Sequence, residues 1–200
     1  MKKANIAVLV SGGGTNLQAL IDAQKAGIIQ SGQLRLVISN KADAYALKRA
    51  ADAGIATLVI EKKECADHAE FEGRIVDALT EYDIDIIVLA GFMVILSQSF
   101  TTRYPKRIIN VHPSLIPSFC GEGFYGLRVH QAALEYGVKV TGATVHFVNE
   151  IPDGGEIILQ KAVAIEQGDT PEILQRRVME QAEWIILPRA VEKVSAEIIK

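Results

Sequence analysis

The stretch Ile6-Ala-Val-Leu-Val-Ser-Gly-Gly-Gly-Thr-Asn16 joins an apolar, β-branched run to a glycine-rich turn. A strand without polar alternation is typical of a parallel sheet that helices cover on both faces. Three consecutive glycines allow the backbone to approach a ligand closely. Leu17, Leu20 and Ile21 follow at helical spacing. The stretch therefore predicts a strand, a ligand-binding turn and a helix, which form the first unit of an α/β fold.

The alternation of apolar runs and helical patterns continues through the first half of the chain. Phe71, Ile75 and Leu79 recur at helical spacing, and the alanine-rich residues 42–53 predict a helix that Gly54 ends. The further strands expected here are residues 34–38, 56–60, 84–89 and 107–111. Strands that alternate with helices predict a doubly wound, mostly parallel sheet with right-handed crossovers, as in nucleotide-binding folds.

The last third of the chain predicts a different arrangement. Residues 140–148 and 157–165 form long apolar-rich runs on either side of Pro152-Asp-Gly-Gly155, which indicates an antiparallel hairpin. A final helix is expected from Thr170, a good N-cap, through Pro171 to about the end of the chain. We therefore expect an α/β fold: a doubly wound, mostly parallel sheet with an antiparallel C-terminal hairpin, in a single domain over residues 1–200.

Composition and charge narrow the class of protein. Two hundred residues suit one domain, and a content of 49% hydrophobic and 22% charged residues excludes a disordered chain. The 21 basic and 24 acidic residues give a net charge of −3, so no overall positive field is available to hold nucleic acid or an anionic membrane. The most apolar run, residues 86–96, is too short to span a bilayer. Cys65 and Cys120 form no C-x-x-C pair, and we see no export signal, so we expect a cytoplasmic protein.

The glycine-rich turn at residues 11–16 is the first candidate site. Free amides at a helix start, in the positive end of the helix dipole, suit a phosphate group. The turn lacks the Lys-Ser/Thr pair of a Walker loop, and Leu17 stands where a G-x-G-x-x-G motif has its third glycine. A monophosphate therefore fits the turn better than a dinucleotide. The structural alternative is a tight turn that Thr15 or Asn16 caps.

Asn110 and His112 form the second candidate site, at the end of the fifth expected strand. Their spacing puts both side chains on one side of the strand, at the carboxyl edge where open α/β sheets bind ligands. Asp153, the third candidate, can orient an imidazole and keep it protonated if the fold brings the two together. Taken singly, His112 also suits a structural role beside Pro113, and Asp153 suits an ordinary hairpin turn.

Other chemistry-bearing residues give weaker signals. His68, His130 and His146 show no i, i+4 pair, so we expect no metal. Residues 118–126 combine glycines with aromatic side chains, which indicates a mobile flap or, equally, a plain surface loop.

Five motifs occur in register along nearly the whole chain. They are SGGGTN at residues 11–16, SNKADA at 39–44, LAGFM at 89–93, NVHPSLIP at 110–117, and VHFV at 145–148 followed by DGG at 153–155. Together they resemble the phosphoribosylglycinamide formyltransferases, the folate-dependent enzymes of purine synthesis. The resemblance implies the formyltransferase fold and transfer of a formyl group from 10-formyltetrahydrofolate to the amine of glycinamide ribonucleotide. It implies small-molecule partners for a monomer or a homodimer, without metal, membrane or nucleic acid.

The resemblance also implies roles for individual residues. Asn110, His112 and Asp153 match the family's catalytic trio, in which the amide and imidazole stabilise an oxyanion and the carboxylate assists proton transfer. The residues expected to bind the ribonucleotide are Gly14, Thr15, Asn16 and Glu183. The residues expected to bind the folate are His68, Met93, Val94, Ile95, Leu96 and Asn110.

The chain departs from the family pattern at several positions. Val94 and His68 stand where relatives carry arginine. Glu180 stands where a lysine or glutamine assists the phosphate, and Trp184 replaces a histidine. The segment formed by residues 118–126 is longer than the corresponding segment in many relatives. These departures bear on affinity more than on the type of reaction.

Three other functions share part of these features. A 10-formyltetrahydrofolate deformylase uses the same trio and passes the formyl group to water, but those relatives carry an extra N-terminal regulatory domain and this chain begins at its first strand. A methionyl-tRNA formyltransferase calls for a further C-terminal domain and a surface that suits tRNA. A non-catalytic nucleotide-binding module would use the glycine turn but leave the trio without a joint role.

Overall fold

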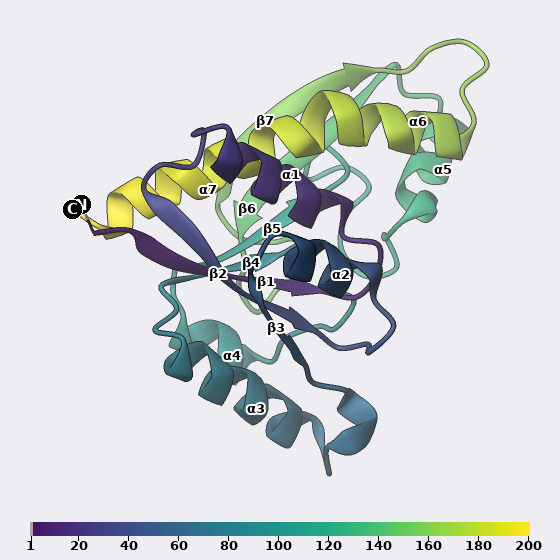
Figure 1. The fold of residues 1–200 in the computed structure, drawn as a ribbon. Coiled ribbons are helices and arrows are strands. Elements are labelled where there is room, and N and C mark those ends of the chain that lie inside the picture. Colours follow the sequence, from purple (N-terminus) through teal and green to yellow (C-terminus); the bar gives the residue numbers. More distant parts are fainter. Residues whose placement is uncertain (1) are drawn as a thin grey trace.

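A computed structural model describes residues 2–200, which form a seven-stranded sheet with helices on both faces (Figure 1). The strand order is β3-β2-β1-β4-β5-β6-β7. The strands are β1 (Ala4–Val10), β2 (Gly32–Ser39), β3 (Ala56–Val59), β4 (Ile86–Leu89), β5 (Ile108–His112), β6 (Val140–Phe147) and β7 (Ile157–Ala164). The first five strands pair in parallel, and β6 and β7 run antiparallel to their neighbours. This confirms the expected α/β class with its antiparallel C-terminal hairpin.

The helices form two layers, one on each face of the sheet. They are α1 (Thr15–Lys25), α2 (Tyr45–Asp52), α3 (His68–Glu81), α4 (Gln98–Arg103), α5 (Leu127–Tyr136), α6 (Pro171–Val178) and α7 (Trp184–Ile198), with short segments η1 (Lys62–Glu64) and η2 (Met179–Glu183). Figure 1 shows α1 and α7 on one face and α3 and α4 on the other. In β1, Ile6 and Val8 pack with the first layer, whereas Ala7 and Leu9 pack with the second. Both faces of β1 are therefore buried, which explains why Asn5 is the single polar residue of this strand.

The order of the strands determines where a ligand can bind. From β1 the chain moves outward to β2 and β3, and it then returns to add β4 on the other side of β1. The connections that follow β1 and β4 leave in opposite directions, which opens a crevice at the carboxyl ends of these two strands. The glycine turn follows β1, and residues 93–96 follow β4, so the fold places both candidate segments at this crevice.

The hairpin of β6 and β7 has a longer connection than a tight turn. The strands end and begin at Phe147 and Ile157, so nine residues link them. The Gly154 amide donates to the Ile151 carbonyl at 2.9 Å, and Asp153 takes a positive φ of 55°. At Gly155, a Cβ atom would lie 1.7 Å from the Phe147 carbonyl oxygen, so only glycine fits there. The connection thereby holds Asp153 over the end of the sheet.

Two expected helices differ from the observed ones. Helix α2 begins at Tyr45 rather than at residue 42, because residues 41–44 form a turn in which the Ser39 hydroxyl donates to the Lys41 carbonyl at 2.7 Å. The final helix starts with Thr170 as its N-cap, as expected, and its helical backbone runs unbroken to Ile198, although it is not α-helical throughout. The π-helical segment η2 separates α6 from α7, and Pro188 lies inside α7, where it cannot donate the usual backbone hydrogen bond.

Candidate active site

The side chains of Asn110, His112 and Asp153 meet at the carboxyl end of β5. Asn110 and His112 alternate along β5 and point to the same side, and Asp153 reaches them from the connection between β6 and β7. Asn110 Nδ2 lies 3.5 Å from Asp153 Oδ1, and His112 Nδ1 lies 3.4 Å from Asp153 Oδ2. The structure thus brings together three residues that are up to 43 positions apart in sequence.

His146 is a fourth member of this cluster, and the sequence analysis gave it no role. It lies opposite Asn110 in the antiparallel pairing of β5 and β6. Its Nε2 atom is 3.2 Å from Asn110 Nδ2 and 3.5 Å from Asp153 Oδ1, and its Nδ1 atom is 2.9 Å from the Phe147 carbonyl oxygen. The carbonyl can only accept, so Nδ1 donates to it, and Nε2 faces both the Asn110 amide and the Asp153 carboxylate. The His146 ring therefore packs against both Asn110 and Asp153.

The Asp153 carboxylate stays charged in this cluster. Burial alone would raise the pKa of Asp153, but hydrogen bonds from His146 and from the Gly121 amide, together with the charges of His112 and His146, lower it below its ordinary value. The cluster can therefore stabilise negative charge on a reacting oxygen and accept a proton close by.

Residues 118–126 contact the cluster through their backbone. The His112 Nε2 atom lies 2.9 Å from the Phe119 carbonyl oxygen, and the Gly121 amide donates to Asp153 Oδ2 at 2.9 Å. Cys120 lies between these two residues, and burial followed by the charge of Asp153 raises the pKa of its thiol. Each ring nitrogen of His112 thus faces an oxygen acceptor.

The glycine turn leaves the first amides of α1 without a side-chain cap. Gly14 is the N-cap, with a positive φ of 72°, and it has no side chain to accept from the helix. Thr15 and Asn16 do not cap the helix either, because the Thr15 hydroxyl points to Met179 and Asn16 Nδ2 donates to Glu183 Oε2 at 2.7 Å. Uncapped amides at the positive end of a helix form an anion-binding site. The structural alternative of a side-chain cap is therefore wrong.

Glu183 joins the last helical stretch to the turn. The side chain is buried, and its burial raises the pKa of Glu183 to about 7, although the hydrogen bond from Asn16 acts in the opposite direction. Gly14, Thr15, Asn16 and Glu183, the four residues expected to bind the ribonucleotide, thus lie together in the structure.

The residues expected to bind folate divide into two groups. Val94, Ile95 and Leu96 line a cavity of about 140 Å³ that also touches Asn110, His146 and Asp153. That volume is below the range of about 300–1,000 Å³ usual for ligand pockets. The other group, Met93 and His68, does not line the cavity.

Met93 and His68 nevertheless connect to the segment that lines the cavity. The Met93 amide donates to the Ser11 hydroxyl at 2.9 Å, which ties this segment to the start of the glycine turn. His68 Nε2 lies 3.2 Å from Glu72 Oε1, and Glu72 accepts from the Ser97 amide directly after the segment. His68 is therefore linked to the residues that line the cavity only indirectly, through Glu72 and Ser97.

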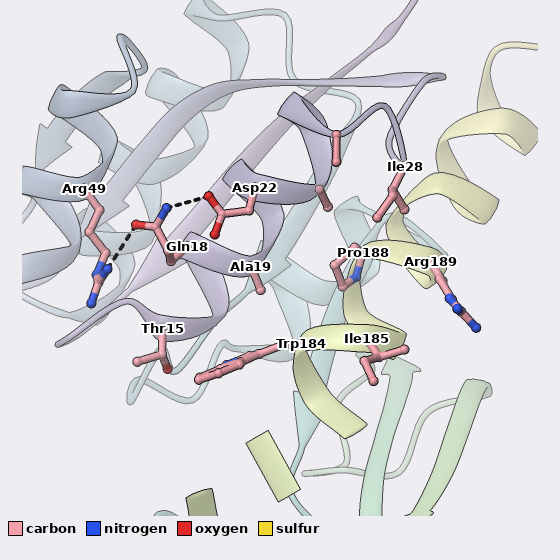
Figure 2. A pocket seen from close by; sticks show the side chains of 12 residues that line it. Thr15, Gln18, Ala19, Asp22, Ile28, Arg49, Trp184, Ile185, Pro188 and Arg189 are labelled. Atoms are coloured by element: carbon pink, nitrogen blue, oxygen red, sulfur yellow. Dashed lines mark hydrogen bonds between the residues drawn. The ribbon is translucent and has the colours of Figure 1, made fainter. Parts of the chain in front are cut away.

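A larger cavity lies elsewhere, between α1 and α7. It has a volume of about 570 Å³, and it touches the glycine turn at Thr15 (Figure 2). The trio contributes nothing to its lining, so size alone does not locate the reaction. Within residues 2–200, no group of three or more His, Cys, Asp or Glu side chains is placed to hold a metal ion, and no helix is both long and apolar enough to cross a membrane. Cys65 and Cys120 are free thiols.

A comparison with known protein families decides which family has this arrangement. The formyl transferase family model matches residues 4–191. The chain belongs to the formyl transferase family. The match runs from β1 through about half of α7 and includes the whole cluster around Asp153.

The similar proteins carry names of purine biosynthetic or glycinamide ribonucleotide formyltransferase proteins. The trifunctional purine biosynthetic protein adenosine-3 of Homo sapiens is 48% identical over 195 residues, which cover 98% of this chain and 19% of the relative. The phosphoribosylglycinamide formyltransferase of Haemophilus influenzae is 46% identical over 192 residues, 96% of this chain and 86% of the relative. A crystal structure of glycinamide ribonucleotide transformylase 1 from Symbiobacterium toebii superposes with a TM-score of 0.91 at 42% identity, over 98% of this chain and 89% of that one.

The chain spans about a fifth of the length of the trifunctional relatives it matches. A formyltetrahydrofolate deformylase from Pseudomonas syringae shares the fold with a TM-score of 0.85, but at 24% identity and over 62% of that chain. At this identity the likeness shows the fold alone.

Proposed function

We propose that this formyl transferase moves the formyl group of 10-formyltetrahydrofolate to the amine of phosphoribosylglycinamide, giving the N-formyl product and tetrahydrofolate in purine synthesis. The names of its full-length relatives support this substrate pair. The observation that carries the proposal is the convergence of Asn110 and His112 on Asp153 within 3.5 Å. A binding module has no use for that arrangement.

The proposed chemistry is attack of the amine nitrogen on the formyl carbon. A bond forms between these atoms, and the formyl oxygen gains negative charge in the tetrahedral intermediate. Asn110 Nδ2 and the His112 ring donate to that oxygen, which is the role of an oxyanion hole. The bond from the formyl carbon to N10 of the folate then breaks. The amine loses one proton and N10 gains one, with Asp153 placed to pass the proton on through water.

The proposed binding sites flank this cluster. Gly14, Thr15 and Asn16 hold the ribonucleotide phosphate through their backbone amides, and Glu183 contacts the ribose side. The segment of residues 93–96 supplies backbone groups and apolar side chains for the pterin ring of the folate. We propose His68 as a contact for the acidic tail of the folate, since it lies beyond the cavity and its ring is a third exposed.

The proposed unit of activity is one formyltransferase domain over residues 1–200. We propose that the two small-molecule substrates are its partners and that it acts as a monomer or homodimer without a metal. A cytoplasmic location fits the two free thiols.

An amine-dependence assay tests this function. Purified protein is incubated with 10-formyltetrahydrofolate, with and without phosphoribosylglycinamide, and both tetrahydrofolate and formate are measured. We expect tetrahydrofolate to form only with the ribonucleotide, in equal amount to the N-formyl product. Formate release that does not depend on the ribonucleotide would show the deformylase reaction instead. The His112→Ala variant is the negative control in both arms.

A further inference from the structure

Arg49 of α2 is the cation whose side chain bonds to the glycine turn. Its Nε atom donates to the Gly13 carbonyl at 2.8 Å, and its Nη1 atom donates to Gln18 Oε1 at 3.0 Å. The guanidinium carbon also lies 4.9 Å from the centre of the Tyr45 ring. Figure 2 shows Arg49 and Thr15 at one end of the cleft between α1 and α7, with Arg189 at the other end. The guanidinium is thus held in one place beside the turn.

Helix α2 holds Arg49 rigidly against the turn. The Ala46 amide donates to the Gly12 carbonyl at 3.0 Å, and a Cβ atom on Gly14 would lie 2.6 Å from the Ala46 Cβ atom. Residues three apart share one face of a helix, so Arg49 projects from the same face as Ala46. The position of the guanidinium relative to the turn amides therefore follows from backbone packing and not from a flexible side chain alone.

The Arg49 guanidinium has N–H groups that make no hydrogen bond to residues 2–200. Arginine carries five N–H groups, and the two hydrogen bonds to Gly13 and Gln18 use two of them. The remaining three, on Nη1 and Nη2, have no acceptor among residues 2–200. A planar fork with free N–H groups is well suited to phosphate oxygens.

Helix α6 and η2, on the other side of the turn, offer no free cation. Arg176 donates from Nε to Glu180 Oε1 at 2.8 Å, and Arg177 is paired with Asp169 and Glu166. Glu180 is the residue that stands where the family pattern has a phosphate-assisting lysine or glutamine. In this chain that position carries a negative charge, so the positive charge for a phosphate has to come from another side of the turn.

We propose that Arg49 binds the phosphate group of the ribonucleotide and makes this formyl transferase selective for phosphorylated substrate. The inference rests on the proposed function for the identity of the substrate, and on the contacts of Arg49 for the role of the residue. A phosphate monoester carries a charge of about −1.5 to −2 at pH 7, more than the partial charge of about +0.5 at a helix start. Arg49 supplies the balancing charge beside the amides of Gly14, Thr15 and Asn16.

The kinetic test compares two substrates in one protein. For wild type and the Arg49→Gln variant, kcat/KM is measured with the ribonucleotide and with the dephosphorylated glycinamide riboside. We expect the ratio of the two values to fall about tenfold to a hundredfold in Arg49→Gln, the size of a hydrogen bond to a charged group. Arg49→Lys keeps the charge without the fork and restores part of the ratio. Equal losses with both substrates would show that Arg49 only supports the turn, and would overturn the proposal.

Arg189→Gln is the matched control. It removes the same charge from the far end of the same cleft, where Arg189 is exposed and makes no hydrogen bond within the described chain. The ratio should stay at the wild-type value in this variant. A similar fall in both variants would mean that any positive charge nearby suffices, which contradicts a specific role for Arg49.

A binding measurement separates this proposal from the proposed function. Ribose 5-phosphate is titrated calorimetrically into wild type, Arg49→Gln and Arg189→Gln, each checked for folding by its thermal midpoint. We expect Kd to rise at least about tenfold in Arg49→Gln alone. An unchanged Kd in Arg49→Gln, or no binding to wild type, would overturn the role of Arg49. Failure of wild type to formylate the ribonucleotide would instead overturn the proposed function and leave this comparison intact.

Discussion

The Nε2 atom of His112 lies 2.9 Å from the carbonyl oxygen of Phe119. Phe119 has a positive φ of 50°, a backbone conformation that residues other than glycine rarely adopt. Two residues later, the Gly121 amide donates a hydrogen bond to Asp153. Residues 118–126 thus satisfy the imidazole and the carboxylate of the cluster from the protein itself. A substrate oxygen that accepts from Nε2 has to displace the Phe119 carbonyl.

Substrate binding should therefore loosen residues 118–126 from the cluster. Hydrogen exchange is measured by mass spectrometry for peptides that contain Gly121, with and without saturating substrate analogues. We expect faster exchange of the Gly121 amide in the complex, because its hydrogen bond to Asp153 opens. Peptides from β1, which is buried on both faces, provide the reference. Slower or equal exchange at Gly121 would contradict the displacement.

Removing an oxyanion donor should reduce turnover strongly. We expect Asn110→Ala and His112→Ala each to lower kcat about 10²- to 10³-fold, the usual value of one such donor, with a smaller effect on folate binding. Steady-state kinetics and a folate titration measure the two effects. Near-normal kcat in either variant would exclude that side chain from the chemistry.

Asn5→Ala is a suitable control for Asn110→Ala. Asn5 lies on β1 near its amino end, and its side chain donates to the Asp83 carbonyl at 2.9 Å. The same truncation of an asparagine side chain there removes one exposed hydrogen bond near the amino end of β1, whereas the cluster lies at the carboxyl end of β5. We expect kcat to stay within about twofold of wild type, since exposed sites have small effects.

Gly14→Ala should weaken ribonucleotide binding and destabilise the fold. Gly14 has φ 72°, which costs an alanine about 1–2 kcal/mol, and the new Cβ atom would lie 2.6 Å from the Ala46 Cβ atom. We expect a higher KM for the ribonucleotide and a lower free energy of unfolding in urea. Gly13→Ala is the comparison, because its Cβ atom meets nothing within 4 Å. Equal KM values in the two variants would argue against the phosphate site.

The buried Glu183 and His130 should give opposite pH dependences of stability. Burial raises the pKa of Glu183 from 4.5 to about 7, so the folded protein keeps a proton that the unfolded chain releases. Stability from this group falls as pH rises from 4.5 to 7, by about 3 kcal/mol. Burial, and then the charge of His112, lower the pKa of His130 from 6.5 to about 4. Stability from His130 therefore rises with pH between 4 and 6.5, by a similar amount.

Single variants should separate the contributions of Glu183 and His130 to the pH dependence of the free energy of unfolding. In wild type the two groups largely cancel between pH 4.5 and 6.5. We expect the free energy of unfolding of Glu183→Gln to rise with pH across this window, and that of His130→Leu to fall. Urea unfolding at a series of pH values measures all three proteins. Parallel curves for wild type and both variants would refute the assignment.

Short-range patterns in the sequence predicted much of the fold. The buried strands β1, β4 and β5 show little polar alternation, which indicated a sheet covered on both faces. Helices α4 and α5 were not predicted. Helix α4 has six residues and depends on Ser97 as a cap. Helix α5 (Leu127–Tyr136) has glycines as its capping residues, Gly126 and Gly137, and therefore no side-chain cap. Such helices are stabilised by tertiary packing more than by local sequence.

The candidate site was predictable only in part for a similar reason. Alternation along one strand put Asn110 and His112 on the same side. The place of His146 depends on the register between β5 and β6, in which Asn110 pairs with His146 across 35 intervening residues that include helix α5. The backbone groups of Phe119 and Gly121 cannot be identified by residue type at all, because every residue carries them.

The π-helical segment η2 makes the contact between Asn16 and Glu183 depend on residue count. An α-helix turns about 100° per residue, so an extra residue in a turn rotates everything that follows. With this segment in place, both Ala182 and Glu183 are buried. Deleting a single residue there would leave every proposed contact residue in the chain and still swing Glu183 away from Asn16. The proposed ribose contact of Glu183 thus depends on helical phase as well as on side-chain chemistry.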